Sequence, residues 1–538
     1  MATWRRHLPW LAPTASSLLL FTAFLPGQFA WAGFTWAIPL ALWSATEPSW
    51  KTWRRTTGLA ALITWSIILI WLRHVYPPLG WLGWIIVSSY CALYLFTWLL
   101  ALRWIFPTLG GRNWAYRLLA MLGLAGLWIG LEALRGWALT GFGWLPLAAS
   151  QVSNPVMLSL CEVTGQLGLS GAVILGNLAV ARWIRRQIVE RRDLSGPRNI
   201  LTGLTPEIYL GFAPVALAFA IHVDFRLNLI NTSDTTRTLR VAAVQTDVDP
   251  NAKWDSQRLA EQLESLRELT RDAGSTKPDF ILLPEAAIAV LPLRHSGYLA
   301  TLRDLSQETG CPIVLGALEE RKEEYANAIA AVGPEGVIGL PYAKRHLVPF
   351  GEYVPLADWL PLRKVVPISR DCLRGMSATP ILLSTRAGDT VILGPLVCYE
   401  DVFPELARDH ALAGADVLVV LTNDAWYGRE LGAWQHAAHS SLLAAATRLP
   451  VVRCGNAGWS GSMDTLGRGT PVLREDTIYF QGGFALPSVS YNTQRRETPT
   501  FWVRHGDWIT PPSIALFALA VLVRRRLKIS PVSTQTLS

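Results

Sequence analysis

The sequence predicts a multi-pass α-helical membrane protein with about eight spans, into which an α/β domain is inserted. The first observation is composition: of 538 residues, 51% are hydrophobic and 16% are charged, whereas soluble domains carry roughly 25% charged residues. The second is that apolar residues concentrate in runs before about residue 224 and in one run near the C-terminus. The third is the mixed, charged character of residues 224–507, which is typical of a globular domain.

Seven apolar runs precede the globular domain and one follows it. The runs are Trp10–Phe24, Phe29–Ala45, Gly58–Leu72, Leu82–Leu102, Tyr116–Leu134, Leu167–Trp183, Ile208–Val223 and Trp508–Val523. Several are shorter than the roughly 20 residues of a membrane-spanning helix, so we expect their ends to shift. We therefore predict a membrane domain at 1–223, a globular domain at 224–507, and a last span with a basic tail at 508–538.

Lysine and arginine residues indicate the topology, because cytoplasmic loops of membrane proteins are enriched in them. With a cytoplasmic N-terminus, the short outer loops carry little beyond Arg73 and Arg135. The inner loops carry Arg5, Arg6, Lys51, Arg54, Arg55, Arg103, Arg112, Arg185, Arg186, Arg191, Arg192, Arg198 and the cluster from Arg524 to Lys528. We expect both termini in the cytoplasm and the globular domain outside. The net charge of +8 then reflects topology, and no nucleic-acid partner is expected.

Short apolar segments alternate with amphipathic ones in the globular domain, which predicts a sheet flanked by helices. Functional side chains are expected at strand ends in such a fold. The predicted strands are 239–245, 279–283, 312–317, 391–393, 396–397, 416–422 and 451–453, and the segments 328–332 and 336–339 are predicted to form a hairpin. Helices are predicted after residue 258, at 403–413 and at 434–447.

Three polar residues lie at the end or edge of apolar segments. Glu285 follows ILLP, Lys344 lies in PYAKRHLVPFGEYVP, and Cys398 ends GPLVC. A base can convert a thiol to a nucleophilic thiolate, and a cation can stabilise an oxyanion, so these residue types suit covalent catalysis. Each alone also has an ordinary explanation, as a helix-start acid, a solvated loop charge or a small buried side chain.

The surrounding motifs resemble those of the nitrilase, or carbon-nitrogen hydrolase, superfamily. The blocks LLPE, K-x-x-LVPFGEYVP and G-x-L-V-C-Y-E-D-x-F-P-E occur in this order. Together with the apolar runs, they resemble the bacterial apolipoprotein N-acyltransferase family. The segment from Glu132 to Trp144 is similar to that family's E-x-x-R and GFPW segment, so the resemblance covers nearly the whole chain.

The resemblance implies an αββα sandwich on eight membrane helices, with Cys398 as the acylated nucleophile, Glu285 as the proton acceptor and Lys344 as the oxyanion-stabilising cation. It implies transfer of a fatty acyl chain from a phospholipid to the α-amino group of a lipoprotein's N-terminal diacylglyceryl-cysteine. The expected mechanism is ping-pong through a cysteine thioester, without a cofactor. We expect a monomer in the bacterial inner membrane, with a periplasmic catalytic domain.

The same motifs imply supporting residues. Glu352 in FGEYVP is expected to orient Lys344, and Glu400 is expected to support the site. Tyr399 and Trp426 are expected to line it, and the backbone N–H of Tyr399 is a natural second oxyanion donor. A loop acid or a core aromatic residue is the structural alternative for each of them.

Other polar residues have mainly structural interpretations. His436 and His439 have a helical spacing that could suit a metal, but no third ligand is near in sequence, and we expect them on the helix surface and expect no metal. Glu132 and Arg135 lie on one face of a predicted span, where pairing would reduce the cost of both charges. Lipid headgroup contact is their functional alternative.

The sequence departs from the family pattern in two places. Gly143 replaces the proline of GFPW, and in the 439–456 stretch Ala and Ser replace expected charges while Cys454-Gly455 replaces Ala-Thr. These departures spare the three candidate catalytic residues and bear on acceptor docking or acyl preference. The six cysteines contain no Cys-x-x-Cys pair, although an oxidising exterior would permit a bond such as Cys372–Cys454.

Two other functions remain open. A membrane-anchored nitrilase-like amidase could use the same three residues with water as the acceptor, but a single span would suffice as its anchor. A transporter with an outer ligand-binding domain would place ionisable residues in its spans, where Glu132 is almost the only carboxylate. The phospholipid, the acyl chain and the acceptor lipoproteins are not determined by the sequence.

Overall fold

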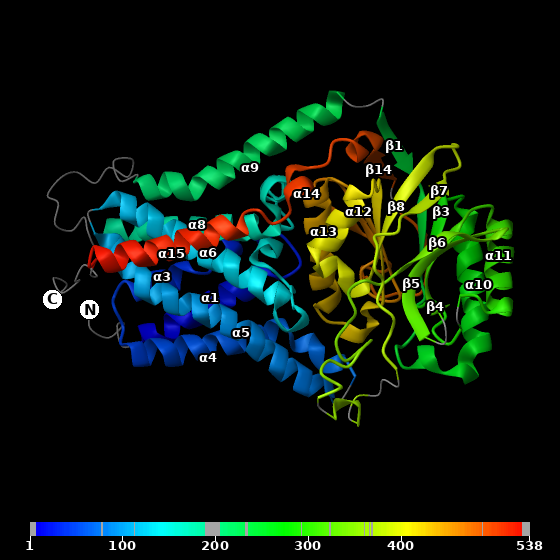
Figure 1. The fold of residues 1–538 in the computed structure, drawn as a ribbon, viewed down its shortest axis with the longest axis horizontal. Coiled ribbons are helices and arrows are strands. Elements are labelled where there is room, and N and C mark those ends of the chain that lie inside the picture. The colour runs from blue at the N-terminus through cyan, green and yellow to red at the C-terminus, as the bar shows by residue number, and fades with distance from the viewer. Residues whose placement is uncertain are drawn as a thin grey trace. The chain divides into compact units, whose positions relative to one another are not determined.

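The computed structural model describes residues 7–529, apart from 77–78, 112, 189–204, 232–234, 292, 322–323, 360, 365, 367–369 and 487. The chain divides into two compact units, one made of Met1–Leu227 with Asp507–Ser538 and one made of Asn228–Gly506 (Figure 1). Among the basic loop residues used to predict topology, Arg5, Arg6, Arg112, Arg191, Arg192 and Arg198 lie outside the described residues.

The first unit is helical, as expected of apolar segments that must satisfy their own backbone hydrogen bonds in lipid. Its helices are α1 (Leu8–Ala23), α2 (Ala30–Gly33), α3 (Ile38–Ser44), α4 (Trp50–Ile68), α5 (Leu79–Ile105), α6 (Trp114–Trp137), α7 (Pro155–Leu158), α8 (Cys161–Ile188), α9 (Pro206–Asn231, which extends into the second unit) and α15 (Thr510–Arg526). Helix α15 packs closely on α6 at Gly126, a residue of α6. A Cβ atom added there would lie only 2.2 Å from the carbonyl oxygen of Ser513 in α15, so the close approach requires glycine.

Several helices are apolar enough for a membrane. Five segments of the described chain are long and apolar enough to cross one: Leu79–Gly110, Trp114–Thr140, Cys161–Gln187, Pro206–Asn228 and Thr493–Arg526. The expected number of eight spans is therefore not confirmed. The predicted run Phe29–Ala45 forms two short helices, and Pro39 occupies the first turn of α3, where a missing N–H costs no hydrogen bond.

The second unit contains two six-stranded sheets, with strand orders β13-β2-β3-β4-β5-β6 and β12-β11-β10-β9-β8-β7. The first sheet is built from β2 (Val241–Gln245), β3 (Phe280–Leu283), β4 (Ile313–Arg321), β5 (Glu324–Gly333), β6 (Gly336–Ala343) and β13 (Gly482–Ala485). The second is built from β7 (Ile381–Ser384), β8 (Thr390–Val397), β9 (Val417–Thr422), β10 (Val451–Gly455), β11 (Gly461–Met463) and β12 (Gly469–Pro471). A separate antiparallel pair joins β1 (Thr236–Leu239) and β14 (Val489–Asn492).

The two sheets and four helices form an αββα sandwich. Phe280 and Val314 of the first sheet share one apolar core with Val391 and Val419 of the second. Helices α10 (Leu259–Ser275) and α11 (Ser296–Thr309) cover the outer face of the first sheet, while α12 (Pro404–Leu412) and α13 (Gly432–Thr447) lie along the second (Figure 1). A short helix, α14 (Phe501–His505), packs beside α12 and α13. The αββα sandwich that the resemblance implied is thus confirmed.

Candidate active site

Glu285, Lys344 and Cys398 each follow a strand of the sandwich. Glu285 comes two residues after β3, Lys344 comes directly after β6, and Cys398 comes directly after β8. Although β8 belongs to the other sheet, the fold brings the three side chains into mutual electrostatic contact. Their exposed fractions are 8%, 1% and 8%. The sandwich therefore encloses all three in an environment of low polarity, where charge interactions are strong.

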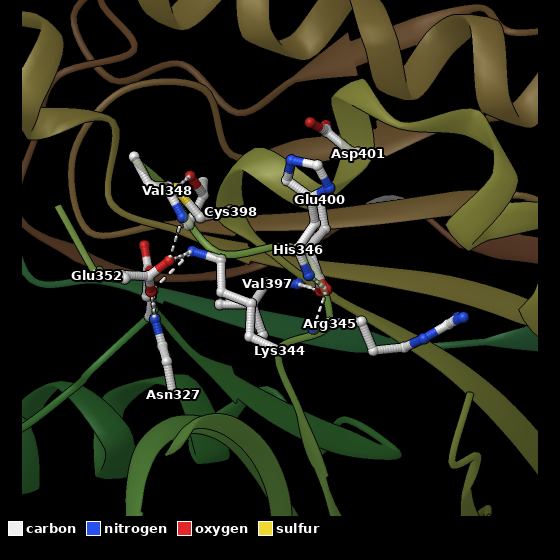
Figure 2. A network of polar contacts seen from close by, with 12 residues as sticks. Asn327, Lys344, Arg345, His346, Val348, Glu352, Val397, Cys398, Glu400 and Asp401 are labelled. Carbon is white, nitrogen blue, oxygen red and sulfur yellow. Dashed lines mark hydrogen bonds and ion pairs between the residues drawn. The ribbon is translucent and has the colours of Figure 1, made fainter. Parts of the chain in front are cut away.

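The ammonium group of Lys344 lies close to two carboxylates, and Figure 2 shows its contact with Glu352. Its Nζ atom is 2.9 Å from Oε2 of Glu352 and 3.7 Å from Oε1 of Glu285. Burial alone would lower the pKa of Lys344, but the carboxylates of Glu352 and Glu285 outweigh burial and raise the pKa. Lys344 is therefore a permanent cation with a fixed position, and the expected neighbour Glu352 does hold it.

Two polar residues that are absent from the sequence prediction also hold Glu285. Asn327, on β5, donates from Nδ2 to Oε1 of Glu285 and to Oε1 of Glu352, each at 2.8 Å. Lys253 donates from Nζ to the backbone oxygen of Glu285 at 2.9 Å, and burial lowers the pKa of this lysine to about 8. The sequence signal for Asn327 is its position between two alanines in an apolar strand. A buried amide needs hydrogen-bond partners, so this position indicates a polar contact inside the domain.

Cys398 occupies a sharp turn between β8 and the 3-10 helix η12 (Cys398–Val402). Its φ angle is +51°, a left-handed conformation that strains a non-glycine residue and often marks a functional site. Burial and the carboxylate of Glu285 raise the pKa of the Cys398 thiol well above its usual range, and the opposing effect of Lys344 is smaller. The resting side chain is therefore a neutral thiol with a carboxylate nearby.

Glu400 connects the segment after β6 to the cysteine turn (Figure 2). Its Oε1 atom accepts hydrogen bonds from the backbone N–H groups of Arg345 at 2.6 Å and His346 at 3.1 Å. Its Oε2 atom accepts one from the N–H of Val397 at 2.7 Å. Burial raises the pKa of Glu400 to about 7. The expected supporting residue thus joins the segments that carry the cation and the thiol.

The two aromatic candidates lie on segments that flank the thiol. Tyr399 directly follows Cys398, and its ring packs edge-on against Phe403 with centroids 5.0 Å apart. Trp426 is half-buried in the 3-10 helix η13 (Asp424–Tyr427). Burial and the nearby Cys398 raise the pKa of Tyr427, the residue after this tryptophan. The structure therefore places Tyr399 at the cysteine and Trp426 on a neighbouring segment.

A second group of charged side chains, here called the charge cluster, consists of Asp401, Asp424, His436 and Arg453. Nε2 of His436 lies 2.8 Å from Asp401, and its Nδ1 lies 2.7 Å from Asp424. Arg453 forms ion pairs with both aspartates, and all four side chains are completely buried. The expectation that His436 and His439 lie on a helix surface is wrong, because α13 is buried along its length. Among the described residues, no group of three side chains could hold a metal.

Replacing His436 with glutamine is expected to remove a pH-dependent part of the stability. Burial disfavours the charged ring, but Asp401 and Asp424 outweigh it and raise the pKa of His436 from 6.5 to about 9. A group whose pKa rises on folding stabilises the fold below its unfolded pKa, and this contribution is lost as the pH rises through the folded pKa. The wild type should therefore lose on the order of 3 kcal/mol between about pH 6.5 and pH 9. The variant should lack that loss.

The measurement is the melting temperature of the full-length protein in detergent between pH 6 and pH 9. His410→Gln is the matched control, because burial lowers the pKa of His410 to about 3 and keeps it neutral throughout this range. An unchanged pH dependence in His436→Gln would show that the buried ring is not charged.

The atypical 439–456 stretch contributes to the interior of the sandwich. Cys454 is buried in the core, and its Sγ lies 3.3 Å from the backbone oxygen of Val244 and 3.5 Å from that of Leu282, so its single proton can go to either. Ser440 donates a 2.7 Å hydrogen bond to an aspartate of the charge cluster. All six cysteines are free, so a bond between Cys372 and Cys454 is not formed.

Glu132 and Arg135 in α6 bind the chain that follows this helix. Oε1 of Glu132 accepts a 2.7 Å hydrogen bond from the N–H of Leu147. Arg135 donates to the backbone oxygen of Leu145 at 3.3 Å, and its guanidinium lies 4.9 Å from the ring centre of Trp65. These contacts support the structural interpretation of both charges.

A two-sheet sandwich with a glutamate, a lysine and a cysteine gathered at its strand ends defines a carbon-nitrogen hydrolase domain. Residues 240–483 match the family model described as carbon-nitrogen hydrolase. Residues 16–179 match the model described as the apolipoprotein N-acyltransferase N-terminal domain. The chain belongs to the apolipoprotein N-acyltransferase family.

Relatives of that name align with both units. The apolipoprotein N-acyltransferase of Geobacter metallireducens is 31% identical over 539 residues, which cover 96% of each chain. That of Azotobacter vinelandii is 32% identical over 442 residues, which cover 79% of this chain and 78% of the relative. The protein is therefore a membrane enzyme with acyltransferase activity and a nitrilase-like α/β domain.

Proposed function

We propose that this enzyme transfers a fatty acyl chain from a membrane phospholipid to the α-amino group of diacylglyceryl-cysteine at the N-terminus of lipoproteins. The observation that carries the proposal is a neutral Cys398 thiol beside the Glu285 carboxylate and the buried Lys344 cation, in a chain of this acyltransferase family. Because the cysteine itself carries the acyl group, the reaction uses no cofactor.

In the first half-reaction, Sγ of Cys398 attacks the ester carbonyl carbon of the phospholipid, and the thiol proton passes to Glu285. Lys344 and the backbone N–H of Tyr399 stabilise the oxyanion. The ester carbon–oxygen bond then breaks, and Glu285 returns the proton to the leaving alkoxide. Lysophospholipid departs and a thioester remains on the cysteine. The raised pKa of the thiol means that its proton leaves only as the carbon–sulfur bond forms.

In the second half-reaction, the free α-amino group of the lipoprotein attacks the thioester carbonyl carbon. Glu285 takes a proton from the attacking nitrogen, the carbon–sulfur bond breaks, and Glu285 passes that proton to the leaving sulfur. The same cation stabilises both oxyanions. A ping-pong order follows, because the lysophospholipid leaves before the amine enters.

The supporting residues position these groups. Glu352 and Asn327 hold Lys344 and Glu285 through hydrogen bonds of 2.8 to 3.0 Å. Glu400 holds the backbone on both sides of the site. We assign Tyr399 and Trp426 to the lining of the acyl site.

The enzyme's surroundings follow from its loop charges. We propose that both termini are cytoplasmic and that the α/β domain lies on the periplasmic side of the bacterial inner membrane. The lysine and arginine residues of the predicted inner loops favour this orientation, because cytoplasmic loops are enriched in them. A monomer contains every residue that the mechanism uses.

The proposal predicts equal yields of N-acylated peptide and lysophospholipid. Full-length enzyme is mixed with phospholipid vesicles carrying labelled acyl chains and with a diacylglyceryl-cysteine peptide. Cys398→Ala should reduce transfer to background, whereas the control Cys372→Ala should retain it. Hydrolysis of a small amide without acylation of the peptide would instead support the membrane-anchored amidase.

A further inference from the structure

Thr422 contacts the proposed nucleophile and has no part in the mechanism above. It is the last residue of β9 and is completely buried. Its Oγ1 atom lies 3.2 Å from Sγ of Cys398 and 2.8 Å from Oδ1 of Asp424. A hydroxyl has one proton, so it cannot donate to both acceptors at once. The direction of this proton therefore depends on the charge of the sulfur.

We propose that Thr422 stabilises the thiolate character of Cys398 by turning its hydroxyl proton from Asp424 to the sulfur as the thiol proton leaves. This inference rests on the proposed role of Cys398 as the nucleophile. While the sulfur is a thiol or a thioester, it is a weak acceptor, and the hydroxyl donates to the Asp424 carboxylate. When the sulfur carries negative charge, it becomes a strong acceptor and attracts the same proton. No bond to carbon forms or breaks in this step.

Asp424 can release the hydroxyl because the charge cluster holds it. Nδ1 of His436 lies 2.7 Å from Oδ1 of Asp424, and Arg453 lies 3.6 Å from Oδ2. The guanidinium also approaches Nδ1 of His436 at 3.2 Å, a like-charge contact that Asp401 and Asp424 neutralise. Two aspartates, one histidine and one arginine balance in charge. Asp424 thus keeps a donor when Thr422 turns away.

Several other charged or titratable groups act on the same sulfur and must stay constant in a test. They lie after β3 and β6, on η13, in the short helix at 252–254, and on β10: Glu285, Lys344, Asp424, Tyr427, Lys253 and Arg453. A substitution at Thr422 keeps all six of these groups, and it removes the hydroxyl's own hydrogen bond to Asp424. A change in the thiol's pH profile in such a variant would therefore report the hydroxyl itself.

The experiment compares Thr422→Val, which removes the hydroxyl at nearly constant shape, with Thr422→Ser, which keeps it. Full-length protein in detergent is treated with iodoacetamide between pH 6 and pH 10, and alkylation of the Cys398 peptide is followed by mass spectrometry. Thr422→Val should slow alkylation about tenfold or more and shift the rise of the alkylation rate to higher pH. Thr422→Ser should match the wild type.

Alkylation of the half-buried Cys372 in the same samples shows whether the fold is intact. If Thr422→Val does not fold, Thr422→Ala removes the same hydroxyl and should give the same shift. The inference is overturned if the hydroxyl-free variant keeps the wild-type profile, or if Thr422→Ser behaves like Thr422→Val. Alkylation needs neither phospholipid nor acceptor, so this result is independent of whether acyl transfer occurs.

Discussion

Replacing Lys344 with methionine is expected to reduce acyl transfer by about 10²–10³-fold, because the oxyanion loses its charged donor. The same change should destabilise the sandwich by about 3–5 kcal/mol, because Glu285 and Glu352 are then buried without the cation between them. Initial rates of peptide acylation and the melting temperature of the purified protein measure the two effects.

Two variants separate the chemical effect from the structural one. Lys364→Met removes an exposed lysine from the short helix at 362–364 and should change neither rate nor stability. The double variant Lys344→Met with Glu352→Gln removes one cation and one anion, and should recover much of the stability but not the rate. Recovery of acyl transfer in the double variant would show that Lys344 is not the oxyanion cation.

Replacing Glu285 with glutamine is expected to lower acyl transfer at neutral pH by about 10²–10⁴-fold, because the thiol loses its general base. Glutamine can still accept the hydrogen bond from Asn327, so the site should remain folded. The residual rate should rise about tenfold per pH unit, since hydroxide must then remove a proton from a thiol whose pKa is raised. The wild-type rate should rise less over the same range. Transfer rates between pH 6 and pH 10 test both statements.

Glu264→Gln is the matched control, because Glu264 lies on the exposed face of α10 and bonds only locally to Arg267 in the described contacts. It should keep the wild-type rate and pH profile. A Glu285→Gln enzyme with the wild-type rate would require a different proton acceptor.

The strands that carry the site could be predicted because they are short, fully buried and apolar. The predicted segments 279–283 and 416–422 correspond closely to β3 and β9. Glu285 and Cys398 follow the apolar segments of β3 and β8, and this placement can be recognised from the amino-acid sequence alone. Strands β7 and β11–β14 are three or four residues long and contain glycine or polar residues, so they lack the continuous apolar run that made the equally short β3 recognisable.

The second layer of the site could not be predicted, because it depends on contacts between residues far apart in sequence. In the sequence, Asn327 is a single amide in an apolar strand. Only the folded structure shows that it bonds to Glu285, which follows β3, and to Glu352 in the 344–352 segment. His436 resembles a surface residue because its helix is rich in alanine and polar residues. It is buried because two aspartates from other segments neutralise it.

The division of the first unit into spans was also only partly predictable. The run Phe29–Ala45 is as apolar as a membrane span, yet it forms two short helices. Hydropathy reports how apolar a segment is, whereas the breaks in its helices depend on proline positions and on tertiary packing.

The most direct test of the proposed mechanism is to mix the enzyme with phospholipid in the absence of any acceptor. Ping-pong chemistry predicts a burst of one lysophospholipid per enzyme and an acyl thioester on the Cys398 peptide, with neither in Cys398→Ala. Adding the diacylglyceryl-cysteine peptide should then discharge the thioester into N-acylated product. If no lysophospholipid is released until the acceptor is present, and the Cys398 peptide stays unmodified, the covalent mechanism is contradicted.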